Sequence, residues 1–244
     1  MVTFKYSHVG SALLVLVATA MGSPRSEAPK HLGVAETLVE NLQNAKLNVY
    51  GGGKRHIDWE PEKCSARTVC CSFVTLLFQH TYGWSNDDFN GWMQSTNPEA
   101  DAYHDAVVAE NGFKRIKKVN HLEPGDILAV KYTDGHVSRN GVVDTGHVML
   151  VANKPHRIKE HGPLVPDTKQ FIVEVIDSSA SGHGPRDTRH RDDGSFTGGI
   201  GRGEFRIYTN ADDEMVGYAW SNGSKSEYES SPSRDLVAGR LTKQ

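Results

Sequence analysis

The chain has 244 residues, of which 23% are charged and 37% hydrophobic, and its formal net charge is −3. This composition is typical of a globular protein, and the length suffices for one domain with a core that needs no disulfides to fold. No basic run or stripe stands out, so the sequence argues against a nucleic-acid partner.

The first 20 residues predict a secretory signal peptide. MVTFKYSH has one lysine and no acid, and the apolar run VGSALLVLVATA ends in Ala-Thr-Ala. This is the order of a signal peptide, and the run is shorter than the roughly 20 residues of a membrane span. We expect cleavage near Ala20, a secreted or periplasmic protein and no stable membrane anchor; an uncleaved anchor is the alternative.

Helical patterns occupy the first half of the chain. Residues 21–33 are small and polar and predict a linker, and a single domain is expected over residues 34–219. Apolar residues at helical spacing from Ala35 predict a first helix. The cysteine segment from residue 64 predicts a second helix that stops at Gly83, and residues 97–112 predict a third.

Strand patterns follow in the second half. Short apolar runs predict strands at 127–132, 147–152, 171–177 and 204–208, with weaker candidates at 215–220 and 236–241. Residues 220–244 are expected to form a polar loop with a possible final strand. Helices followed by strands predict an α+β fold in which N-terminal helices pack on an antiparallel sheet.

All three cysteines lie within eight residues, at Cys64, Cys70 and Cys71. Their spacings do not match those of zinc ligands, so we expect no metal. In an exported protein a disulfide is plausible, and the odd number leaves one thiol free. A Cys64–Cys71 bridge leaves Cys70, and a Cys64–Cys70 bridge leaves Cys71.

A free thiol at a helix start suits a nucleophile. With Thr68 as the predicted N-cap, Cys70 would lie in the first turn, near unpaired N–H groups and the positive end of the helix dipole. Both features favour the reactive thiolate. An inert buried thiol is the alternative reading.

A nucleophile of this kind needs a base and a group that orients the base. His147 follows Gly146 and opens an apolar strand, and Asp177 ends another strand. If these strands are antiparallel neighbours, the two ends come together and complete a Cys-His-Asp triad. A structural core histidine and a turn aspartate are the alternatives.

Several motifs resemble those of NlpC-like cysteine peptidases. VCCSFV resembles the Asp-Cys-Ser-Gly-Phe-Val signature, and alignment on Phe-Val puts the nucleophile at Cys70, with Cys71 as the alternative. LEPGDIL and TGHVMLV resemble the turn and histidine strand of the family. VYGG and VIDSS stand where the family has a tyrosine segment, which would be Tyr50, and a third polar residue, which would be Asp177.

The resemblance implies a papain-like core and cleavage of amide bonds in peptidoglycan stem peptides, without a cofactor. Cys70 would attack the carbonyl carbon, His147 would transfer protons and Asp177 would hold the imidazole. Backbone N–H groups at the helix start, with the hydroxyl of Tyr50, would stabilise the oxyanion. We leave open whether an inhibitor or immunity protein binds.

Two further hypotheses concern the substrate. Arg186 and Arg189 in SGHGPRDTRH could hold a substrate carboxylate, or the loop could be solvated or paired with Asp187. On the same fold, the chain could instead be a CHAP-like amidase, an acyl transferase, or a catalytically inactive module that binds cell wall or another partner.

Overall fold

The computed structural model describes Met1 and residues 28–243, except residues 44, 52, 138–140, 142 and 192. Apart from Met1, the predicted signal peptide lies outside these residues, as does most of the predicted linker. The first helix begins at Lys30, inside the stretch expected to be a linker. Among the described residues, no helix has both the length and the apolar composition that a membrane span requires.

The α-helices lie in the first half of the chain, as predicted. They are α1 (Lys30–Leu42), α2 (Cys70–Tyr82), α3 (Asn86–Met93) and α4 (Ala100–Val108), with short 3₁₀ turns at Pro61–Lys63 and Val119–His121. Helix α2 ends at Gly83, whose φ of 71° gives the left-handed C-cap that the sequence predicted.

The predicted N-cap of α2 is wrong. Val69, not Thr68, precedes the helix, and the Val69 N–H donates to the Ser72 hydroxyl at 2.9 Å. Thr68 is instead the last residue of strand β3, and its hydroxyl donates to the Ser178 hydroxyl at 2.9 Å. Thr68 therefore ties β3 to the large sheet, and Cys70 is the first helical residue of α2.

The strands form two sheets. A small one has the order β1-β3-β2, from β1 (Asn48–Tyr50), β2 (His56–Asp58) and β3 (Ser65–Thr68). A nine-stranded antiparallel sheet has the order β11-β10-β9-β8-β6-β5-β12-β4, with β7 also paired to β8. Its strands are β4 (Phe113–Ile116), β5 (Ile127–Tyr132), β6 (Gly146–Val151), β7 (His156–Arg157), β8 (Lys169–Ser179), β9 (Gly199–Thr209), β10 (Met215–Ala219), β11 (Tyr228–Glu229) and β12 (Arg234–Leu241).

This architecture contradicts the predicted α+β, papain-like fold. Strands hold more of the described residues than helices do, and the dominant element is the nine-stranded antiparallel sheet. β8 and β9 extend well beyond the predicted apolar runs and pair along their whole length. β12 comes from the region expected to be mainly a polar loop, yet it lies between β5 and β4. The protein is therefore mostly β.

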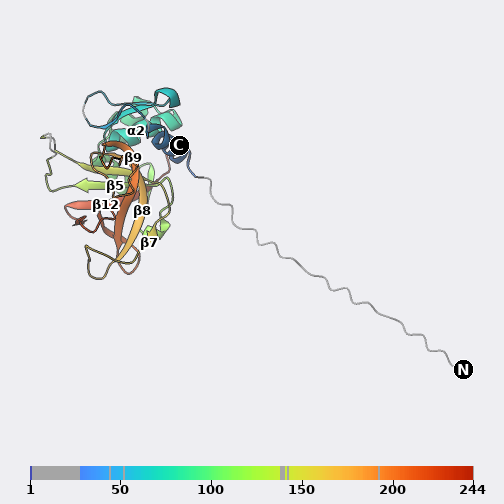
Figure 1. Ribbon diagram of the computed structural model, residues 1–244, viewed down its shortest axis with the longest axis vertical. Coiled ribbons are helices and arrows are strands. Elements are labelled where there is room, and N and C mark those ends of the chain that lie inside the picture. The colour runs from blue at the N-terminus through green and yellow to red at the C-terminus, as the bar shows by residue number, and fades with distance from the viewer. Residues whose placement is uncertain are drawn as a thin grey trace.

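Two hydrophobic clusters divide the residues of the sheet between them. Side chains of α1, α2 and α4 pack with Val148 and Leu150 of β6, whereas Met149 and Val151 of the same strand belong to the other cluster. This alternation is that of a strand buried on both faces. In Figure 1 the helices gather at one end of the molecule, above the strands of the large sheet.

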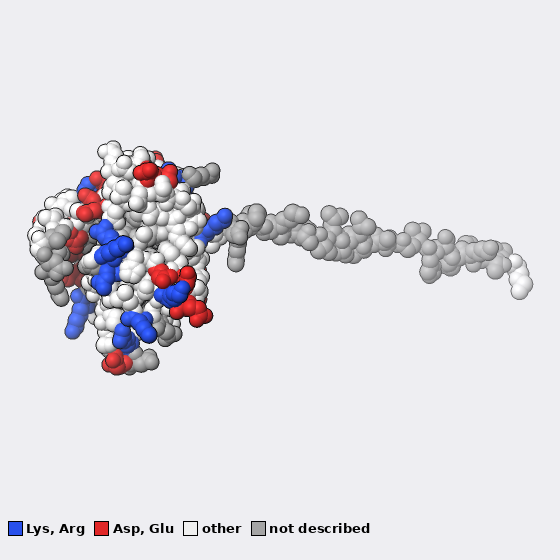
Figure 2. Space-filling view, turned by 90° about the horizontal axis from the view of Figure 1, so that it is seen from above, with Lys and Arg blue, Asp and Glu red and all other residues white. Residues whose placement is uncertain are grey.

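Charged side chains of both signs are interspersed on one face of the protein (Figure 2). On the face shown in Figure 2, lysine and arginine side chains lie beside aspartate and glutamate side chains. This arrangement agrees with the small net charge of the sequence.

Candidate active site

His147 is held at the start of β6 by the glycine before it. Gly146 has a φ of 141°, and a Cβ on this residue would lie 1.9 Å from the backbone oxygen of Val130 on β5. Only glycine fits there. His147 pairs in register with Val130, and its ring meets Trp220 edge-to-face with centroids 4.7 Å apart.

The structure brings His147 and Asp177 together. The Nε2 atom of His147 lies 2.6 Å from Oδ2 of Asp177, which is on β8 and fully buried. Because a carboxylate accepts, Nε2 carries the proton and donates it, and this leaves Nδ1 as the nitrogen with the lone pair. The two residues meet as the sequence predicted, although β8 continues past Asp177 to Ser179.

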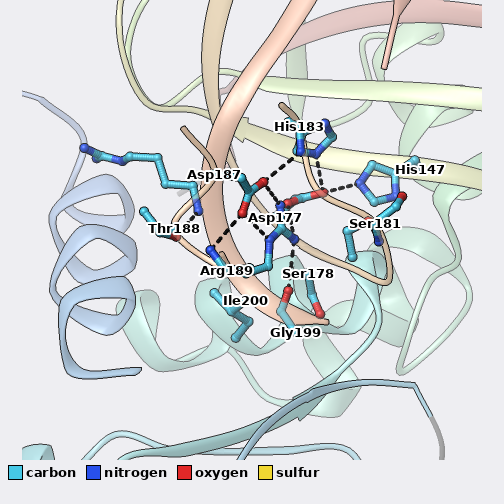
Figure 3. A network of polar contacts seen from close by, with 12 residues as sticks. His147, Asp177, Ser178, Ser181, His183, Asp187, Thr188, Arg189, Gly199 and Ile200 are labelled. Atoms are coloured by element: carbon cyan, nitrogen blue, oxygen red, sulfur yellow. Dashed lines mark hydrogen bonds and ion pairs between the residues drawn. The ribbon is translucent and has the colours of Figure 1, made fainter. Parts of the chain in front are cut away.

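Asp177 has two further partners (Figure 3). Nε2 of His183 lies 2.9 Å from the same Oδ2, and Nη1 of Arg189 lies 3.0 Å from Oδ1, in an ion pair that is not aligned as a hydrogen bond. Burial by itself would raise the pKa of Asp177. The charge of Arg189, then that of His183, and the hydrogen bonds from both imidazoles outweigh burial and hold this pKa well below its usual value.

Glycines on β9 make room for the loop between β8 and β9, which supplies His183 and Arg189. Gly201 pairs in register with Asp177, and a Cβ there would lie 2.6 Å from the Arg189 side chain. At Gly203 a Cβ would lie 2.5 Å from Oδ2 of Asp187. The loop can therefore lie directly on the sheet. The alternating glycines of GIGRG were the signal that could have revealed this site from the sequence.

Arg189 is committed to this network rather than to a substrate. Its Nε and Nη2 donate to Asp187 at 2.8 and 2.7 Å, Nη1 donates to the Gly199 carbonyl at 3.1 Å, and the side chain is buried. This corrects the expectation of a carboxylate clamp and agrees with the alternative of pairing to Asp187. Arg186 is exposed and pairs with Glu204. We therefore assign neither arginine to substrate binding.

The three cysteines are free thiols, so the predicted Cys64–Cys71 bridge is wrong. Strand β3 and the extended Val69 separate Cys64 from the helix. Residues in a strand advance by about 3.3 Å each, so the Cα atoms of Cys64 and Cys71 are roughly 15 Å or more apart, far beyond the about 7 Å limit of a disulfide. The same separation excludes a Cys64–Cys70 bridge.

Cys70 lies against the strand that carries His147. The backbone N–H of Val148 is hydrogen-bonded to its sulfur. β6 pairs with β8 only at Leu150 and Val151, so the beginning of β6 is open on that side. Cys70 belongs to the cluster under α2, whereas His147 packs on Trp220 at the other face of the sheet. In the described chain no hydrogen bond joins the Cys70 sulfur to the His147 ring.

Cys70 and Cys71 are coupled thiols. The Cys70 S–H donates to the Cys71 sulfur, which raises the pKa of Cys70 and lowers that of Cys71. Burial acts against ionisation of both, and the charge of Arg55 further lowers the pKa of Cys71. Of the two thiols, Cys71 therefore ionises first, and the Cys70 thiol donates to it.

Tyr50 stands at the edge of the site. Burial and then the proximity of Cys70 raise the pKa of its phenol, so the hydroxyl remains a hydrogen-bond donor at neutral pH. Tyr50 also lines a groove of about 980 Å³. The groove runs between the end of α1, strand β1 and the 188–200 segment, and Lys46 and Arg191 line it from different segments.

A metal ion is an alternative explanation for the cluster of His147, Asp177 and His183. His147, Asp177 and His183 offer three ligand atoms within 4.8 Å of one another. Both imidazoles, however, point an Nε2 atom at the same carboxylate oxygen at hydrogen-bond distance, and Arg189 already faces the other oxygen. A cation would have to displace both N–H donors beside a fixed guanidinium charge, so the donor set fits a hydrogen-bond network better than a metal centre.

Comparison with known proteins gives one relative. No family model and no solved structure matches the chain. A protein of Acanthamoeba polyphaga mimivirus, named "Uncharacterized protein R653", is 36% identical over 181 residues, which cover 71% of this chain and 77% of the viral protein.

Proposed function

Because the chain belongs to the same family as the mimivirus protein R653, whose name assigns no activity, we propose a function from the site itself. The protein is a secreted or periplasmic cysteine hydrolase that cleaves amide bonds in peptidoglycan stem peptides. Cys70 is the nucleophile, His147 the acid and base, and Asp177 the residue that orients the imidazole. The observation that carries this proposal is the His147–Asp177 hydrogen bond beside a thiol bound to the next backbone N–H.

The orientation of His147 suits this role. Its Nε2–H is held by Asp177, so the lone pair on Nδ1 is the one available to take a proton from a thiol. The contact between Val148 N–H and the Cys70 sulfur brings that thiol to the strand residue that follows His147. The Cys70 thiol and the His147 ring lie toward opposite faces of β6, so the reaction requires the His147 ring to turn toward the thiol when substrate binds; apo geometries are often looser than those of the substrate complex.

The same arrangement supplies an oxyanion site. Cys70 is the first residue of α2, so the N–H groups of the first turn have no partner within the helix. With the Tyr50 hydroxyl they can donate to a carbonyl oxygen as it becomes negative. The groove beside Tyr50 is large enough for several residues of a peptide, and Lys46 and Arg191 suit the carboxylates of stem peptides.

The reaction then has two halves. The Cys70 sulfur attacks the carbonyl carbon while its proton passes to Nδ1 of His147, and the tetrahedral intermediate collapses as this proton moves to the leaving amine. Water next gives a proton to Nδ1 and attacks the thioester carbonyl, and the second tetrahedral intermediate releases the acid product as this proton returns from Nδ1 to the Cys70 sulfur. Cys71 can donate to, or accept from, the Cys70 sulfur during both steps.

Incubation of purified muropeptides with wild type and with Cys70→Ala, Cys71→Ala and Cys64→Ala tests the proposal. We expect wild type and Cys64→Ala to release new peptide amino termini, and Cys70→Ala to lose at least about a thousandfold in rate. Separation of glycan from peptide would instead indicate an amidase. If wild type leaves all muropeptides intact, the hydrolase proposal is refuted and an inactive binding module is favoured.

A second measurement separates the two candidate nucleophiles. Mass spectrometry of the protein trapped with substrate in mild acid would show the acylated cysteine. Acylation of Cys71 in the wild type, with activity retained in Cys70→Ala, would transfer the nucleophilic role to Cys71.

A further inference from the structure

The structure points to a role for His183, which the sequence motifs do not identify. We propose that His183 carries a proton on both ring nitrogens and acts as a fixed positive charge that positions Asp177 and, through it, His147. The charge of His183 does not depend on the proposed function. Its positioning role rests on the proposed function.

Both ring nitrogens of His183 face acceptors. Nδ1 lies 2.7 Å from the backbone carbonyl oxygen of Trp220, and Nε2 lies 2.9 Å from Oδ2 of Asp177. A backbone carbonyl can only accept a hydrogen bond, and so can a carboxylate. A neutral imidazole has one N–H, so one of these contacts would set two lone pairs against each other. Two protons on the ring satisfy both contacts.

Charge balance leads to the same state. Asp177 and Asp187 are buried carboxylates, and among the described residues the permanent cation that pairs with both is the buried Arg189. The backbone N–H of His183 donates to Asp187 at 2.8 Å. With a neutral His183, the two carboxylates and the one guanidinium would leave the buried network with an uncompensated negative charge, which is costly. With a doubly protonated His183, the net charge of the network is zero.

The surroundings of His183 leave one alternative. Its ring is completely buried, and the other groups that face it in the described part of the chain are aromatic (Trp220 and Phe205) or the His147 ring, 6.3 Å away between centroids. A protonated Asp177 could donate to a neutral His183. Arg189 and the Nε2–H of His147 both favour the Asp177 carboxylate instead.

This assignment affects the reaction through His147. Asp177 accepts from His147 and His183 at one oxygen, so a His183 that always donates holds that oxygen in place and ionised. The Nε2–H tautomer of His147 then persists, and Nδ1 remains free for the thiol. His183 is thus a positioning residue and touches no reacting atom.

Nitrogen NMR of the full chain labelled with ¹⁵N-histidine tests the charge. At pH 7.5 we expect both ring nitrogens of His183 to give the signals of a protonated imidazolium, whereas a histidine of ordinary acidity is about 90% neutral there. Loss of the signals in His183→Gln assigns them. If that variant does not fold, cross-relaxation to the Trp220 indole assigns them, because the two ring centroids are 4.5 Å apart. A single neutral tautomer of His183 at pH 7.5 would overturn the proposal.

Two variants test the positioning role. In His183→Gln we expect the His147 spectrum to change from the Nε2–H form to a mixture of tautomers and kcat on muropeptides to fall roughly tenfold or more with KM unchanged. His183→Lys keeps a cation and should recover most of this loss. An unchanged His147 spectrum in a folded His183→Gln would refute positioning. An imidazolium at His183 in a wild type without hydrolase activity would refute only the proposed function.

Discussion

The Asp177→Asn substitution tests the central network most directly. Asn keeps the size of the side chain but removes the negative charge with which Arg189 and His183 interact. Its amide N–H groups would also face the N–H donors of these residues. Breaking a buried ion pair by removing one partner costs about 3–5 kcal/mol, because the remaining charge is left uncompensated. In a chain of this length, each kcal/mol lowers Tm by about 2–4 °C, so the loss in Tm should be roughly 6–20 °C. Both Asp177 and Arg189 are buried here, which places the pair in this regime.

Urea unfolding followed by circular dichroism measures this loss, with Asp212→Asn as the matched control because Asp212 is exposed. The pKa of Asp177 is held well below its usual value of 3.8. Its stabilisation is therefore complete above that value and is lost as the pH falls from there towards the lower pKa of the folded state. The difference between wild type and Asp177→Asn should be constant from about pH 5 to 6 and should narrow below about pH 4. A loss under 1 kcal/mol at pH 7 would contradict the network as the source of stability.

Three further predictions concern single residues around the site. Gly146→Ala should destabilise the fold by about 3 kcal/mol or more, because the new methyl group meets a backbone oxygen at 1.9 Å; Gly91→Ala, with open space around it, is the control in the same unfolding assay. As the pH rises towards 9, iodoacetamide should modify Cys71 before Cys64, because the pKa of the Cys71 thiol is lowered and burial raises that of Cys64. Mass spectrometry that shows the reverse order would argue against the thiol pair. Tyr50→Phe should lower kcat on muropeptides by roughly 100-fold with an unchanged Tm, and full activity would remove Tyr50 from the oxyanion site.

Local patterns in the sequence predicted several elements because their causes are local. Apolar spacing and a glycine stop located α2, and short apolar runs located β5 and β6 within one residue. The fold class was wrong for a physical reason. β12 and the long ends of β8 and β9 contain charged and glycine residues, so their strand conformation depends on pairing with neighbours distant in sequence.

The candidate site divides in the same way. His147 and Asp177 could be recognised because each is a polar residue at the end of an apolar run, and antiparallel pairing brings such ends together. The roles of His183, Asp187 and Arg189 were missed, because nothing within the loop itself distinguishes it from a solvated one and the signal lay in the glycines of β9. Only its packing on the glycines of β9 buries the charges and makes them pair.

The sequence by itself determined where the helix with the thiols and the strand with the histidine lie, since backbone propensity and side-chain periodicity act over a few residues. The tertiary structure decided that the thiols are unbridged, that Arg189 serves Asp177 rather than a ligand, and that the large sheet recruits the C-terminal strand. Each of these outcomes depends on which distant groups share a buried space, where an unpaired charge or backbone group is too costly to remain.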